Sequence, residues 1–88
     1  MTNGDASTGT FPNVEVHNPN WKPLASHLGE KNIRMCDWMW MYRKDGIEYY
    51  KHSVTRKYLA LDDGGHCWMN GWMRVDFWKA YRKACSME

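Results

Sequence analysis

The sequence predicts an α+β domain, in which a small antiparallel β-meander of about four to five strands packs with a short N-terminal helix and a C-terminal amphipathic helix on one face. Three observations favour this fold class. The dipeptides Asp45-Gly46 and Asn70-Gly71 are typical centres of the tight turns that join antiparallel strands. The residues beside these turns are rich in aromatic side chains, which favour strands. After Asp76, the apolar residues change to helical spacing.

Length and composition predict one small domain over residues 14–88, preceded by a disordered tail over residues 1–13. A chain of 88 residues supports only one core, and 15% of its residues are aromatic, including six Trp and five Tyr. The tail has no sustained apolar period that would offset the entropy of ordering it. At its end, the alternation Val14-Glu15-Val16 is typical of a short strand at a sheet edge.

Two helices are predicted, one before the strands and one after them. Asn20 is a suitable N-cap for the first helix, Leu24 and Leu28 share one of its faces, and Gly29 is the expected left-handed stop. Asp76 is the expected N-cap of the second helix. The apolar face of this helix comprises Phe77, Ala80, Tyr81 and Ala84, and its polar face comprises Lys79, Arg82, Lys83 and Ser86.

The strongest hairpin signal lies between Cys36 and Val54. Asp-Gly favours a type I′ turn because both of its positions need positive φ. A two-residue loop at Asp45 and Gly46 predicts four cross-strand pairs: Arg43 with Glu48, Tyr42 with Tyr49, Met41 with Tyr50, and Trp40 with Lys51.

Two further turns extend the meander. The segment Asp62-Asp63-Gly64-Gly65 predicts that Leu59 lies opposite Trp68. Asn70-Gly71 predicts that Met69 lies opposite Trp72, and Trp68 opposite Met73. The connection over residues 53–56 contains no Gly or Pro, so its geometry is not predicted.

No cofactor, metal site or catalytic residue is expected. Zinc ligands usually occur in close pairs, whereas His66 and Cys67 are neighbours that point to opposite faces of a strand. No nucleophile has an activating local context, and the glycines lack phosphate-loop spacing. The odd number of cysteines and the lack of a signal or membrane segment favour a soluble cytoplasmic protein with three free thiols.

The first functional hypothesis is recognition of a protein partner through the sheet. On the predicted first strand, Trp38, Trp40 and Tyr42 share one face and Met39 and Met41 the other, and one terminal helix cannot cover both faces. Exposed aromatic and Met side chains are typical of interfaces. The predicted contact residues are Met39, Met41, Tyr50 and Lys51. The alternative is that a small core simply needs all of the large rings.

The second hypothesis is nucleic-acid binding. Residues 31–88 hold eleven basic and seven acidic side chains, and basic residues between exposed rings can hold phosphates while bases stack. The candidate contacts on the hairpin tips and last helix are Arg43, Lys44, Arg56, Lys57, Lys79, Arg82 and Lys83. Acidic residues punctuate the same surface, so an ordinary mixed solvated face is the competing interpretation.

One segment of about eighteen residues contains Trp38, Asp45-Gly46, Tyr49-Tyr50, His52 and Thr55. With these residues it resembles the first two strands of a WW domain, a small sheet that binds proline-rich peptides in an aromatic groove. The His is displaced by one position, and the second signature Trp with its following Pro is missing. Because any aromatic Asp-Gly hairpin matches this far, the resemblance implies no binding residues here.

Overall fold

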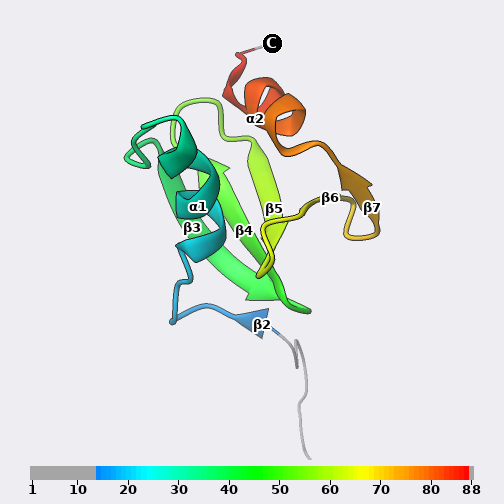
Figure 1. Cartoon of the computed structure of the whole chain (residues 1–88). Helices are drawn as coiled ribbons and strands as arrows, with labels where there is room; N and C mark the ends of the chain where they lie inside the picture. Colours follow the sequence, from blue (N-terminus) through cyan, green and yellow to red (C-terminus); the bar gives the residue numbers. More distant parts are fainter. Residues whose placement is uncertain (1–13, 88) are drawn as a thin grey trace, which may run out of the picture.

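The computed structural model describes residues 14–87, so the predicted tail over residues 1–13 lies outside the described residues. In the described part, six antiparallel strands form one sheet in sequential order, with two helices, and the predicted α+β class is confirmed (Figure 1). The sheet has slightly more strands than predicted. The elements are β2 (Val14–Glu15), α1 (Lys22–Glu30), β3 (Trp38–Lys44), β4 (Ile47–His52), β5 (Tyr58–Asp62), β6 (Cys67–Met69), β7 (Met73–Val75) and α2 (Phe77–Cys85).

The core lies on one face of the sheet, here called the inner face, which α1 covers (Figure 1). Leu24 and Leu28 of α1 are fully buried, as their spacing predicted. They belong to one apolar cluster with side chains from β3, β4, β5, β6 and α2. The buried sheet residues of this cluster are Trp38, Tyr50, Leu59, Leu61 and Cys67.

The ends of α1 differ in detail from the prediction. Trp21 is the N-cap residue, while the side-chain carbonyl of Asn20 accepts a hydrogen bond from the backbone N–H of Lys22 at 3.1 Å. The prediction that Gly29 stops the helix is wrong, because Gly29 lies within it. The left-handed residue beyond the helix is Asn32, with φ 55°, a conformation that Asn tolerates better than most residues.

The β3–β4 hairpin has the predicted turn, and both loop residues, Asp45 and Gly46, have positive φ (52° and 79°). Two predicted pairs, Arg43 with Glu48 and Tyr42 with Tyr49, are confirmed. A bulge between Trp40 and Tyr42 then shifts the register, so that the other two predicted pairs are wrong. The observed pairs are Trp40 with Tyr50 and Met39 with Lys51.

This bulge changes which side chains share a face of β3. Trp38 and Trp40 lie on the inner face, opposite His52 and Tyr50, whereas Tyr42 has moved to the outer face. The prediction of one shared face for all three rings is therefore wrong. The bulge lets the Trp40 indole reach the buried carboxylate of Glu48, to which its Nε1–H donates at 2.7 Å.

The pairing of the second hairpin also differs by one residue from the predicted pairing. Asn70 and Gly71 have the expected positive φ of 59° and 80°, but Met69 pairs with Met73, leaving Trp72 as an extra residue after the turn. Trp68 accordingly lies opposite Arg74 instead of Met73. At the preceding turn, Trp68 pairs with Ala60 rather than with the predicted Leu59.

Helix α2 begins as predicted, because the Asp76 carboxylate accepts a hydrogen bond from the Lys79 backbone N–H at 2.9 Å. Phe77 and Ala84 are buried. At its other end, the Thr55 hydroxyl donates to the Ala84 carbonyl at 2.5 Å. This contact joins the residue 53–56 connection to α2.

The same connection is held from within by His52. The Nδ1 atom of this buried side chain accepts hydrogen bonds from the backbone N–H groups of Val54 and Thr55, both at 3.2 Å. An imidazole nitrogen thus provides the acceptor for two backbone N–H groups of this turn, whose geometry the sequence did not predict.

Candidate binding site

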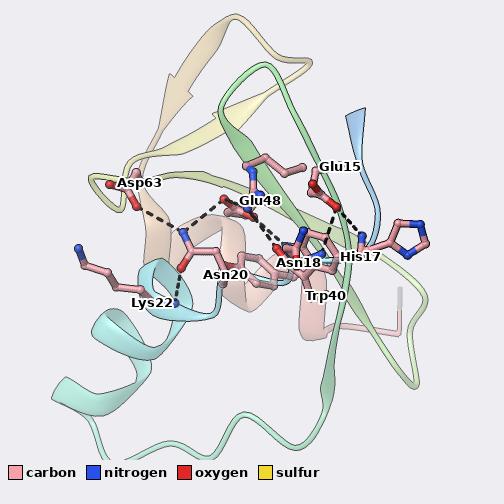
Figure 2. A network of polar contacts seen from close by, with 10 residues as sticks. Glu15, His17, Asn18, Asn20, Lys22, Trp40, Glu48 and Asp63 are labelled. Carbon is pink, nitrogen blue, oxygen red and sulfur yellow. Dashed lines mark hydrogen bonds and ion pairs between the residues drawn. The ribbon is translucent and has the colours of Figure 1, made fainter. Parts of the chain in front are cut away.

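Two regions of the structure have the polar or open character of a functional site, and the first is a polar network around Glu48 (Figure 2). The Glu48 side chain is 2% exposed. Its carboxylate accepts hydrogen bonds from Trp40 Nε1, from the Arg43 guanidinium at 3.1 and 3.2 Å, and from Asn20 Nδ2 at 3.3 Å. The Asn20 amide also donates to Asp63 at 3.3 Å.

This network ties the segment before α1 to the sheet. The Tyr50 hydroxyl donates to the Asn20 carbonyl at 2.6 Å, and the Arg43 guanidinium donates to the Asn18 carbonyl at 3.4 Å. Burial, with the nearby Glu48 charge, raises the pKa of Tyr50, so its hydroxyl remains a donor. Because Glu48 is enclosed and engaged by three side chains, this region acts as a structural tie.

The second region is a groove of about 840 Å³ between β5, the β6–β7 hairpin and α2. Most of its lining is apolar or aromatic, and lysines of α2 stand at its margin. Its lining includes Tyr49, Tyr58, Trp68, Met69, Val75, Lys79 and Lys83. A groove of this size falls within the range of ligand-binding clefts.

The groove exists because β6 covers only part of β5. The two strands pair at Ala60 and Leu61, so the start of β5, at Tyr58 and Leu59, has no strand on that side. The chain leaves β6 at the Asn70-Gly71 turn, returns as β7 and then enters α2. Figure 1 shows the hairpin diverging from the sheet, with α2 near the start of β5.

The tip of the β6–β7 hairpin exposes three large apolar side chains beside this groove. Trp72 is 69% exposed, Met69 42% and Met73 41%. Met69 also lines the groove, so the tip, defined here as Met69, Trp72 and Met73, is continuous with it. An exposed apolar cluster of this kind is typical of an interaction surface.

Trp68 is held in a fixed orientation at the floor of the groove. Its Nε1–H donates to the Asp62 carboxylate at 3.0 Å, and the Arg74 guanidinium lies 5.8 Å from its ring centroid. Burial raises the pKa of Asp62, but the hydrogen bonds from Trp68 and His66 and the nearby His66 charge outweigh it, so the pKa is lowered overall. A preoriented indole is well suited to binding.

The charged residues at the groove are predominantly basic. Lys79 and Lys83 are exposed on α2, and the Lys57 ammonium donates to the Ser86 carbonyl at 2.8 Å. The acidic lining residue, Asp76, is the N-cap of α2. The margin of the groove therefore favours an acidic ligand.

The residues predicted to contact a protein lie partly beside this site. Lys51 is on the outer face, opposite Met39, and its ammonium lies 5.7 Å from the Tyr58 ring centroid. Met39 and Met41 are half-buried. The expected exposure of Tyr50 is wrong, because the bulge places its ring on the inner face, where it is fully buried.

The predicted nucleic-acid contacts do not gather on one surface. Lys57, Lys79 and Lys83 line the groove, and Arg82 is exposed on the same helix as the last two. Arg56 is exposed in the connection beside Lys57, and Lys44 is exposed at the end of β3. Arg43 binds Glu48 in the polar network.

Within residues 14–87, no group of three or more His, Cys, Asp or Glu side chains is arranged to hold a metal ion. The three cysteines are unpaired: Cys36 is exposed, Cys85 is half-buried, and Cys67 is buried. No helix of this part of the chain is both long enough and apolar enough to cross a bilayer.

Comparison with protein-family models, with curated proteins and with solved structures gives no match to this chain. The site must therefore be interpreted from its own geometry and chemistry.

Sequence reasoning missed the groove and the hairpin tip. The available signal was the placement of Met69 and Trp72 on either side of Asn70-Gly71. Turn residues face solvent, so large apolar side chains at a hairpin tip indicate a contact surface. No sequence signal predicts that β6 ends before covering the start of β5.

Proposed function

We propose that this protein is a small non-catalytic binding protein that recognises a protein partner through the groove and the adjoining hairpin tip. The single observation that supports this most strongly is the continuity of an apolar groove with an exposed Trp and two exposed Met side chains. Trp is enriched among the residues that dominate binding energy. Met side chains adapt their shape to a partner's surface.

The same surface favours a protein over a nucleic acid. Trp72 and its two Met neighbours supply apolar area, which protein interfaces bury in their centres. Of the seven basic residues considered for nucleic-acid binding, Arg43 is engaged by Glu48, and the Lys57 ammonium donates to the Ser86 carbonyl near the end of α2. Of the remaining cations, Lys79 and Lys83 line the apolar groove, whereas Lys44, Arg56 and Arg82 do not.

Affinity capture with matched variants tests this proposal. The full chain is immobilised and incubated with nuclease-treated lysate of the source cells, alongside a double variant, Trp72→Ser with Met73→Ser. We expect at least one protein to be retained by the wild type and depleted about tenfold or more by the variant, as for removal of an interface hot spot.

Val54→Ser is the matched control, because Val54 is 62% exposed but lies in the connection after β4, outside the groove lining and the hairpin tip. It should retain the same protein as the wild type does. Equal capture by all three chains would contradict the proposal. A parallel capture uses untreated lysate. Binding that depends on the hairpin tip in untreated lysate but is lost after nuclease treatment would instead support the nucleic-acid alternative.

A further inference from the structure

The start of β5 presents an uncovered strand edge inside the groove. Successive residues of a strand direct their backbone N–H and C=O groups to alternate sides. The Lys57 carbonyl accepts from His52 N–H at 2.8 Å on the β4 side, whereas Asp62 N–H donates to the His66 carbonyl at 3.0 Å on the β6 side. This alternation directs the N–H and C=O of Tyr58 away from β4, into the space that β6 does not reach.

The groove therefore combines two ways of recognising an extended peptide. The Tyr58 edge offers backbone hydrogen bonds to a strand, which would lie about 4.8 Å away. Tyr58 itself is 45% exposed, and Trp68 and Met69 provide apolar contacts for alternate side chains. Peptides that add to a sheet edge gain affinity from the backbone and specificity from such contacts.

Charge indicates which peptide would fit. Lys79 and Lys83, one helical turn apart on α2, line the same groove as Tyr58. Their ammonium groups would interact favourably with carboxylates of a bound peptide.

We infer that the occupant of the groove is an extended segment of a protein partner that adds as a strand to the Tyr58 edge and carries both apolar and acidic side chains. This inference depends on the proposed function and specifies its ligand. It predicts a dependence on the one peptide N–H that faces Tyr58 and a dependence on the two α2 lysines.

The test begins with a displayed library of random peptides selected against the full chain. The strongest binder is synthesised with a fluorophore and titrated by anisotropy, first unmodified and then with single N-methyl groups along its backbone. Methylation of an N–H that faces β5 removes a hydrogen bond and introduces a clash, so affinity should fall about tenfold or more. Methylation of the two neighbouring N–H groups, which face away from β5, should change affinity much less.

The charge requirement is tested with Lys79→Glu combined with Lys83→Glu, which should weaken the selected peptide about tenfold. Arg82→Glu is the matched control, because Arg82 lies on the same helix but does not line the groove. The neutral pair Lys79→Gln and Lys83→Gln should give an intermediate loss. Thermal unfolding of each variant separates loss of binding from loss of folding.

The inference is overturned if no selected peptide binds at the groove, if methylation of every peptide N–H has the same effect, or if the charge-reversed variant binds as well as Arg82→Glu. If tip-dependent capture from lysate persists in any of these cases, the proposed function stands and the partner docks by a folded surface. Self-association of the chain that the groove variants abolish would identify a second copy as the occupant, which also overturns the inference.

Discussion

The two tight hairpins of this protein begin from the same local chemistry and end in different surroundings. Asp45-Gly46 and Asn70-Gly71 both adopt positive φ. A bulge shifts the register between β3 and β4, whereas the β6–β7 pairing is regular and Trp72 is an extra residue between the turn and the first pair. Strands β3 and β4 are seven and six residues long, with an inner face packed against α1. Strands β6 and β7 are three residues each and end in an exposed apolar tip.

This difference indicates that the turn residues determine whether a hairpin forms, while the elements packed around the hairpin determine whether its side chains are buried or exposed. In the first hairpin, the bulge delivers an indole N–H to a buried carboxylate, and the structure gains a polar tie. In the second, the extra residue is Trp72, which stays 69% exposed. The first hairpin contributes mainly to stability, and we propose that the second contributes to recognition.

The largest expected effect comes from removing the tie in the first hairpin. Glu48→Ala leaves the Trp40 indole without its acceptor, removes one of the two acceptors of the Asn20 amide, and leaves Arg43 without its counter-charge. Because the Arg43 side chain keeps 30% exposure, water replaces part of the loss, and we expect destabilisation of about 3 kcal/mol. Urea unfolding measures it. Glu15→Ala is the control, since Glu15 lies at the surface and accepts hydrogen bonds from the nearby backbone N–H groups of His17 and Asn18, and a similar loss there would refute the argument.

A paired glycine substitution compares the two turns directly. Both Gly46 and Gly71 have φ near 80° and no atom close to an added Cβ, so valine introduces similar backbone strain. Gly46→Val should lower the free energy of unfolding by more than about 1 kcal/mol. Gly71→Val should cost clearly less in global unfolding, because the short hairpin can open locally. Equal losses would show that the two hairpins unfold as one unit.

The pH dependence of stability should reveal the junction between the hairpins at Asp62. The lowered pKa of this carboxyl means that its ionised form stabilises the fold above the ordinary Asp pKa of about 3.9. That contribution is lost as pH falls through the lower, folded-state value. The stability difference between wild type and Asp62→Asn should therefore shrink as the pH falls below about 4. A difference that grows on acidification would contradict this sign.

The smallest perturbation is thiol labelling at pH 8, which leaves the chain unmutated. Burial raises the pKa of Cys67 to about 11, whereas Cys36 is exposed. We expect Cys36 to react quickly with a disulfide reagent and Cys67 to react only when β6 opens. Identification of the labelled residue by mass spectrometry measures this order. Rapid labelling of Cys67 would show that β6 is not closed over the core.

Residues that act locally were the most predictable part of this fold. The two X-Gly turns, the Asp76 cap and the buried pair Leu24 and Leu28 follow from neighbouring residues alone. Strand registers were less predictable, because the bulge in β3 reflects packing between distant residues. Trp40, for example, turns inward where it can reach Glu48 from the next strand.

The candidate site was less predictable still. Lys79 and Lys83 were recognised as basic residues of the last helix, and Met39 and Lys51 lie on a row of the sheet that ends at Tyr58. The groove itself depends on where β6 stops along β5 and where α2 returns. Both are properties of tertiary structure that no local pattern encodes.

The lengths of the outermost strands have a consequence for aggregation. An open sheet invites edge-to-edge growth with other molecules, and short or charged outer strands suppress it. Here the described edges are β2, with two residues including Glu15, and β7, with three including Arg74. Neither offers a long flat template for fibril growth. The uncovered edge at Tyr58 is recessed between a hairpin and a helix, where a flexible single strand fits more readily than another folded sheet.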